Sequence, residues 1–224
     1  MTETADGSGA AATSQRTVVA AFDVDGTLTH RDCVAPFLRR VGGVRSLVLA
    51  FARRPLATVR AGLRRDRDRL KEVFVGGVLQ RRSVAEVAEL GRAFAREVER
   101  SQLRADTVAR LRWHQQMGHR TVLVSASLRM YLDPLATALG VEHVVCTDVV
   151  ADAGRYTRVL KGRNCRAAEK VTRLDALLAA HAMTDAEIWA YGDSAGDRQL
   201  LARADHPVWV RGATLRAVPD GLAT

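Results

Sequence analysis

Three apolar runs along the chain end abruptly in small or polar residues. They are TVVAAFDVDG from residue 17, RTVLVSAS from residue 120 and EIWAYGDS from residue 187. Their apolar residues follow one another without alternation, which is typical of strands that are buried on both faces of a parallel sheet. Two weaker runs, EHVVCTD from residue 142 and HPVWVRG from residue 206, have the same character. The pattern predicts all five as strands.

Helical patterns lie between these strands. They cover residues 106–117 and 129–139, each closed by a glycine, and residues 166–182, where leucines and a valine form one stripe. Residues 148–162 are predicted to form a short hairpin that turns at residues 152–154. Because strand and helix alternate, we predict an α/β fold with a three-layer, Rossmann-like parallel sheet core.

Residues 31–104 break the alternation. A strong amphipathic helix begins with Ser83 and Glu86 in capping-box spacing, and shorter helices punctuated by glycine pairs and a proline precede it. We therefore predict a small all-helical domain, here called the cap, inserted after the first strand. The predicted organisation is a disordered tail over residues 1–16, a core of residues 17–30 and 105–224, and the cap over residues 31–104.

Composition narrows the class of protein. The chain has 224 residues, of which 47% are hydrophobic, and none of its apolar stretches reaches the roughly 18 residues that span a bilayer. Its first residues lack the apolar core of a signal peptide. The three cysteines show no metal-binding spacing, which favours reduced thiols and argues against a zinc site. We expect a cytoplasmic protein.

The net charge of +9 is concentrated in the predicted cap, where 18 Lys and Arg face 8 Asp and Glu. Such a segment can attract phosphate-bearing substrates, an anionic membrane or nucleic acid, or can be a solvated helical face. It has no Trp or Tyr for base stacking, so no nucleic-acid partner is expected. The apolar residues 47–51, followed by Arg53 and Arg54, suggest contact with an anionic membrane surface.

Candidate chemistry lies where the strong strands end. Asp23 and Asp25 follow the first strand, Ser125 closes the second, and Asp193 follows the third. Ligands of open parallel sheets bind beyond the carboxyl ends of the strands, so these side chains are expected to converge. Carboxylate ligands without His or Cys suit a hard cation such as Mg²⁺.

These residues resemble a known family. DVDGT at residues 23–27, Ser125 in VLVSAS, Lys170 in GRNCRAAEKVTRL and GDSAGD at residues 192–197 are similar to the four ordered motifs of the haloacid dehalogenase (HAD) superfamily. The helical insert after the first motif resembles subfamily IB, the phosphoserine phosphatase-like branch, which implies that the insert is an all-helical cap of C1 type. The resemblance implies a Mg²⁺-dependent phosphomonoester hydrolase that acts on a small phosphorylated metabolite.

The resemblance also implies roles for the residues. Asp23 would be the nucleophile that forms an aspartyl-phosphate, and Asp25 the general acid and base. Mg²⁺ would be held by Asp23, by the backbone carbonyl of Asp25 and by Asp193. The phosphate would be bound by Thr27, Ser125 and Lys170. Asp197 would orient Lys170 or the metal site.

Each assignment has an alternative. Asp23 and Asp25 can be surface turn residues, Ser125 a residue that closes a strand, and Asp197 an acid that stabilises a helix N-terminus. Lys161, nine residues before Lys170, competes with it as the phosphate-binding lysine.

Three positions depart from phosphoserine phosphatases. Gly196 stands where an Asn is usual, Ala126 where a Gly is usual, and Asp32 where an acidic residue recognises the substrate amine. Asp32 keeps the charge with a shorter side chain. These departures argue against phosphoserine as the substrate but not against hydrolysis, and a phosphatase of lipid-linked phosphates is one alternative. A phosphotransferase and a non-catalytic phosphate-binding relative are further alternatives, and neither substrate nor oligomeric state follows from the sequence.

Overall fold

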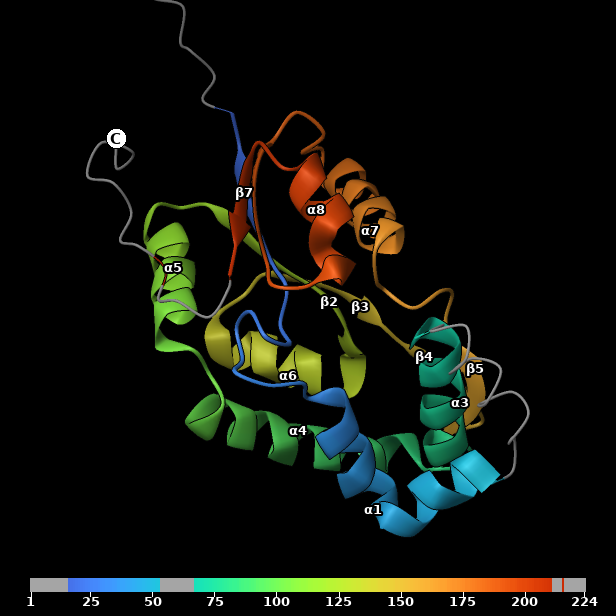
Figure 1. Cartoon of the computed structure of the whole chain (residues 1–224). Coiled ribbons are helices and arrows are strands. Elements are labelled where there is room, and N and C mark those ends of the chain that lie inside the picture. The colour runs from blue at the N-terminus through green and yellow to red at the C-terminus, as the bar shows by residue number, and fades with distance from the viewer. Residues whose placement is uncertain (1–15, 53–66, 211–214, 216–224) are drawn as a thin grey trace, which may run out of the picture.

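The computed structural model describes residues 16–52, 67–210 and 215, and its centre is a five-stranded sheet (Figure 1). The strands lie in the order β3-β2-β1-β6-β7, and every neighbouring pair is parallel. They are the five strands that the apolar runs predict: β1 Val18–Phe22, β2 Arg120–Leu128, β3 His143–Thr147, β6 Glu187–Gly192 and β7 His206–Trp209.

Strand β1 lies at the centre of the sheet, between β2 and β6. Val19 is in register with Arg120 on one side and with Ile188 on the other. Residues 19–22 are completely buried. This position explains the unbroken apolar run, because helices cover both faces of the strand.

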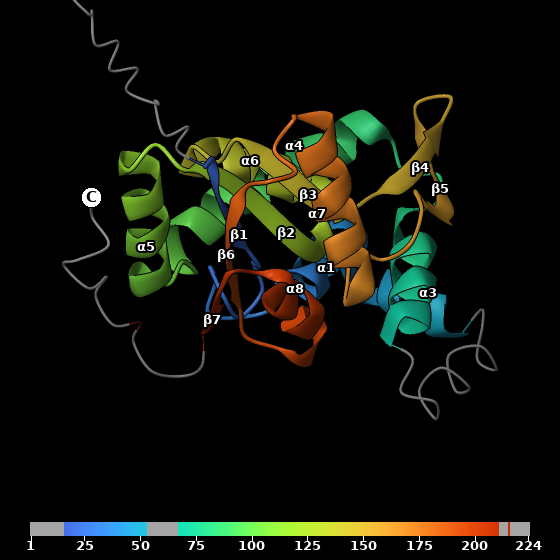
Figure 2. The same cartoon turned by 90° about the horizontal axis from the view of Figure 1, so that it is seen from above.

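Helices pack on both faces of the sheet and complete three layers (Figures 1 and 2). Phe22 and Leu123 belong to a buried cluster with residues of α5 and α6, whereas Ala21 and Val122 pack against α7 and α8. The predicted three-layer α/β core is therefore confirmed. Its helices are α5 Ala105–Gln116, α6 Arg129–Leu139, α7 Ala168–Ala180 and α8 Arg198–Arg203.

A helical insert follows β1, as the sequence predicts, and comprises α1 Val34–Ala52, α3 Arg67–Leu79 and α4 Val84–Ser101. Ser83 caps α4, because its hydroxyl accepts a hydrogen bond from the backbone N–H of Glu86 at 3.5 Å. Gly91 permits close packing of α4 on α6: a Cβ at this position would lie 2.8 Å from the carbonyl carbon of Met130. The insert is thereby fixed beyond the carboxyl end of β1, where it begins (Figure 1).

The predicted hairpin is present as β4 Val149–Asp152 and β5 Arg155–Leu160, which pair antiparallel. It packs against α3, where a Cβ on Gly76 would lie 3.2 Å from the carbonyl carbon of Arg158. The hairpin thus extends the insert, although the boundaries expected from the sequence place it with the core. Those boundaries stay a prediction.

No helix in residues 16–52 and 67–210 is long and apolar enough to cross a membrane. The membrane hypothesis depends on residues 47–51, whose backbone but not side chains the structure describes, and on Arg53 and Arg54, which lie outside the described residues. The predicted tail over residues 1–16 also lies outside it, apart from Arg16.

Candidate active site

The candidate site lies at the carboxyl ends of β1 and β6. From β1 the chain adds β2 and β3 on one side of the sheet and later adds β6 and β7 on the other, so the topology switches between β1 and β6. Ligands of open α/β sheets bind at such a point. Asp23 follows β1 and extends its pairing with β6, because its N–H donates to the carbonyl of Tyr191 at 2.9 Å. Asp193 directly follows β6.

The tight turn after β1 brings Asp193 next to the turn residues. Gly26 has φ +84°, and a Cβ at this position would lie 2.7 Å from Cγ of Asp193. Only glycine adopts this conformation readily and leaves room for the carboxylate. Thr27 is buried, and its hydroxyl donates to Oδ1 of Asp193 at 3.4 Å. The hydroxyl that the resemblance assigns to phosphate thus contacts a carboxylate here.

Lys170, in the first turn of α7, joins two carboxylates at the base of the site. Its ammonium donates to Oδ1 of Asp23 at 2.6 Å and to Oδ1 of Asp197 at 2.5 Å, and all three side chains are buried. Burial lowers the pKa of Lys170, but the two carboxylates outweigh it and raise the pKa above its ordinary value. Lys161, the alternative lysine, is exposed and lines a different cavity with Arg129.

The buried position of Asp23 controls its charge. Burial raises the pKa of Asp23 to about 7, although Lys170 opposes the shift. Asp197 and Asp25 add further negative charge nearby and raise this pKa as well. A second cation at this point would favour the ionised form that a nucleophile needs.

Three carboxylates form a group that fits a hard cation. One oxygen each of Asp23, Asp193 and Asp197 lies within 4.8 Å of the others. Asp197 is already engaged through both oxygens, since Oδ2 accepts from the N–H of Ser194 at 3.0 Å and from its hydroxyl at 2.7 Å. Asp193 is only half-buried, and its bond to Thr27 is long. This oxygen-only donor set suits a hard divalent cation, with Asp23 and Asp193 as the carboxylates open to it.

Asp25 is held in place through both of its oxygens. The N–H of Cys33 donates to Oδ1 at 2.9 Å, and the hydroxyl of Ser127 donates to Oδ2. The buried hydroxyl of Tyr131 donates in turn to Ser127 at 2.7 Å. Burial raises the pKa of Asp25, and the carboxylate of Asp32 raises it further. A raised pKa suits a carboxyl that must carry a proton.

Ser125 does not end its strand, because β2 continues to Leu128. The pairing with β3 shifts register between Ser125 and Leu128, which indicates a bulge of the kind found beside active sites. The buried hydroxyl of Ser125 accepts a hydrogen bond from the N–H of Ser127 at 3.1 Å. The bulge therefore places Ser125 and Ser127 together at the end of the sheet.

Comparison with known proteins decides the family. The family model of haloacid dehalogenase-like hydrolases matches residues 20–202, which is most of the chain. The chain belongs to this family. Protein CicA of Caulobacter vibrioides (strain NA1000) is 36% identical to this chain over 189 residues, which cover 84% of this chain and 83% of that protein. A probable phosphatase of Mycobacterium tuberculosis is 30% identical over 93 residues, 42% of this chain and 32% of its own length.

Solved structures share the fold of this chain. A protein of unknown function from Bordetella pertussis Tohama I superimposes with a TM-score of 0.64 and 29% identity, over 84% of this chain and 86% of that one. A substrate-bound phosphoserine phosphatase superimposes with a TM-score of 0.59 over 85% of this chain and 84% of that one. At 14% identity the second comparison shows a common fold.

The sequence did not indicate three residues of the candidate site. Ser127 and Tyr131 support Asp25, and Lys71 donates to the carbonyl of Ala126 beside Ser125. Ser125 and Ser127 lie two residues apart, and Tyr131 follows four residues after Ser127. This spacing is a sequence signal that both serines belong to the same site. Lys71 gave no such signal, because only the packing of α3 brings it to the site.

Proposed function

We propose that the hydrolase is a Mg²⁺-dependent phosphomonoesterase that acts through an aspartyl-phosphate on Asp23. The observation that carries the proposal is the buried hydrogen-bonded set of Asp23, Lys170 and Asp197, with Asp193 held beside it by the turn at Gly26. A carboxylate fixed by a buried ammonium at a topological switch point has one oxygen left to attack phosphorus.

In the first step an oxygen of Asp23 attacks phosphorus and the bond from phosphorus to the ester oxygen breaks. Asp25, protonated at the start, gives its proton to the leaving alcohol. Both oxygens of Asp25 accept hydrogen bonds from Cys33 and Ser127, which supports a fixed orientation for this transfer. General acid catalysis of this kind contributes typically ~10²- to 10⁴-fold.

In the second step water attacks the phosphorus of the aspartyl-phosphate, and Asp25 takes the proton of that water. The bond from phosphorus to Asp23 breaks, inorganic phosphate leaves, and both carboxyl groups return to their starting states. Lys170 lies against Asp23 throughout and stabilises negative charge on its oxygens and on the phosphoryl group. Ser125, at the bulge of β2, is proposed to donate to a phosphoryl oxygen.

Asp23 and Asp193 are the side chains proposed to hold the cation, together with the backbone carbonyl of Asp25. When bound, Mg²⁺ would neutralise charge on the carboxylates and on the phosphate. Asp197 is proposed to orient Lys170, because both of its oxygens are already engaged with Lys170 and Ser194. The proposed substrate is a small phosphorylated metabolite in the cytoplasm.

The test is release of inorganic phosphate from a panel of small phosphomonoesters, with Mg²⁺ or with EDTA. We expect Mg²⁺-dependent release that Asp23→Asn abolishes. Asp175→Asn is the matched control, since this exposed carboxylate pairs with Arg203 on the surface and should retain activity. Full turnover by Asp23→Asn would contradict the mechanism. Formation of a new phosphomonoester from an added alcohol, without release of inorganic phosphate, would indicate a phosphotransferase instead.

A further inference from the structure

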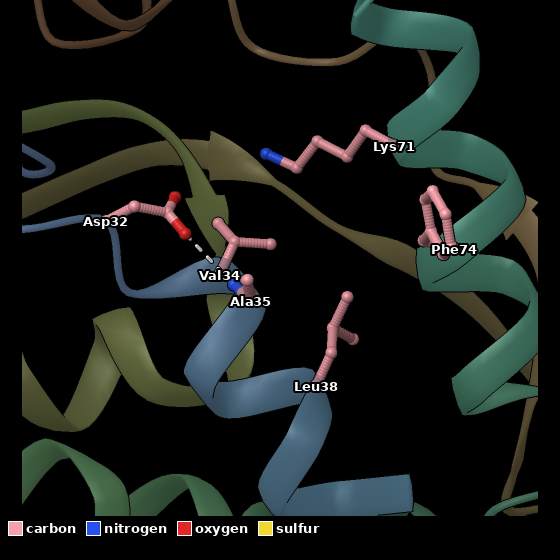
Figure 3. A pocket seen from close by; sticks show the side chains of 6 residues that line it. All are labelled: Asp32, Val34, Ala35, Leu38, Lys71 and Phe74. Carbon is pink, nitrogen blue, oxygen red and sulfur yellow. Dashed lines mark hydrogen bonds between the residues drawn. The ribbon is translucent and has the colours of Figure 1, made fainter. Parts of the chain in front are cut away.

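A cavity of about 410 Å³ lies between α1 and α3 (Figure 3). Its volume is within the range of about 300 to 1,000 Å³ that is typical of small-molecule sites. Figure 3 shows Asp32 and Lys71 reaching toward each other from opposite walls, with apolar side chains below them. The described lining residues are Asp32 from the loop before α1, Val34, Ala35 and Leu38 from the start of α1, and Lys71 and Phe74 from α3.

The charged end of this cavity adjoins the proposed reaction centre. The ammonium of Lys71 donates to the carbonyl of Ala126, the residue after Ser125. Asp32 is close enough to Asp25 to be the second cause, after burial, of its raised pKa, and Lys71 acts on the same carboxyl in the opposite sense. An ester whose phosphorus lies at Asp23 can therefore extend its alcohol past Asp25 into the cavity.

Each of the two charged groups in the cavity wall makes a hydrogen bond to the chain itself. Oδ2 of Asp32 accepts a hydrogen bond from the N–H of Ala35 at 3.1 Å, and Lys71 is bound to Ala126. Among the described residues, the rest of the lining consists of Val34, Ala35, Leu38 and Phe74, whose side chains contain only carbon atoms. A polar group on the alcohol would lose its water against this wall without gaining a partner.

We propose that this cavity binds the leaving alcohol and that the hydrolase prefers phosphomonoesters of alcohols with an apolar body to charged esters such as phosphoserine. The proposal rests on the proposed phosphomonoesterase activity and names its substrate class. Burial of each additional methylene of the alcohol contributes about 0.8 kcal/mol, which is a factor of roughly 4 in affinity. The gain should stop once the cavity is full.

The test uses two series with increasing chain length in the presence of Mg²⁺. Hydrolysis is measured as kcat/KM for n-alkyl phosphates from methyl to octyl, with phosphoserine as the charged comparator. Binding is measured by calorimetric titration of the matching n-alkylphosphonates, whose carbon–phosphorus bond is not hydrolysed. We expect both quantities to rise about 4-fold per methylene and then level off. Burial of apolar surface should also make the heat capacity of binding more negative along the series.

Variants test whether the dependence on alkyl chain length arises in the cavity. Phe74→Ala removes part of the apolar wall and should reduce the gain per methylene to less than 2-fold. Ala35→Phe adds a side chain at an exposed position of the lining, so it should shorten the chain length at which the gain stops without disturbing the core. Val159→Ala is the matched control, because Val159 is 61% exposed on the hairpin and should leave the dependence on chain length unchanged.

Failure of this inference is distinct from failure of the proposed function. Release of phosphate from small esters with no dependence on chain length, or with phosphoserine as the best substrate, would overturn the inference alone. Phosphonate binding that strengthens with chain length, without hydrolysis of any ester, would support the cavity and overturn the proposed function. Neither binding nor hydrolysis in either series would overturn both.

Discussion

Substitution of Gly26 by alanine tests whether the turn after β1 positions Asp193. At φ +84° an L-residue costs about 1 to 2 kcal/mol of stability, and the new Cβ would lie 2.7 Å from Cγ of Asp193. The half-buried carboxylate can move away, so the larger cost should fall on cation binding. We expect Gly26→Ala to reduce affinity for Mg²⁺ by about 10- to 100-fold. This is the typical loss when a residue that orients a metal ligand is mutated.

Gly118→Ala is the matched control. Gly118 has φ +72°, yet no atom lies within 4 Å of the position of its Cβ. Both variants should therefore lose similar stability in urea unfolding, and only Gly26→Ala should need more Mg²⁺ in calorimetric titration and in assays of phosphate release. If Gly26→Ala bound Mg²⁺ within 2-fold of the wild type, the assigned role of the turn would be refuted.

Three further predictions follow from buried groups. Lys170→Met should lower the free energy of unfolding in EDTA by about 3 to 5 kcal/mol, because it leaves two buried carboxylates without their cation; a loss below about 1 kcal/mol would argue against a buried ion pair. Tyr131→Phe should lower kcat about 10-fold with little change in KM, since Ser127 loses the donor that orients it toward Asp25; a change in KM alone would exclude that role. Burial lowers the pKa of His114 to about 3, so its neutral form stabilises the fold above its ordinary pKa of about 6.5, and this stability is lost as the pH falls from there toward 3. Between pH 7 and pH 5 the wild type should lose about 2 kcal/mol more unfolding free energy than His114→Gln, and equal losses would contradict a buried neutral imidazole.

The fold was largely predictable because a central parallel strand leaves a strong pattern. Residues 19–22 are buried on both faces, so their run is apolar without alternation, and the same holds for β2 and β6. Once those strands are parallel, Asp23 and Asp193 must lie at the same edge of the sheet. The local signals of Ser83 and Glu86 likewise predicted where α4 begins.

The parts that could not be predicted depend on packing between distant segments. Nothing local to Lys71 indicates that α3 brings it to Ala126, and nothing local to the hairpin indicates that it packs on α3. The bulge in β2 likewise moved the end of that strand beyond Ser125. The cavity between α1 and α3 is a product of that packing, so the proposed substrate class emerged only from the structure.

The most direct test of the account is the identity of the phosphorylated residue. A short reaction of the hydrolase with an excess of a phosphomonoester and Mg²⁺, stopped with acid, traps any acyl-phosphate, and trypsin then releases the peptide of residues 17–31, which contains both Asp23 and Asp25. The account predicts one phosphoryl group on Asp23, located by fragmentation in the mass spectrometer, and none in Asp23→Asn. A phosphoryl group on Asp25, or substrate turnover with an unmodified peptide at every time point, would contradict it.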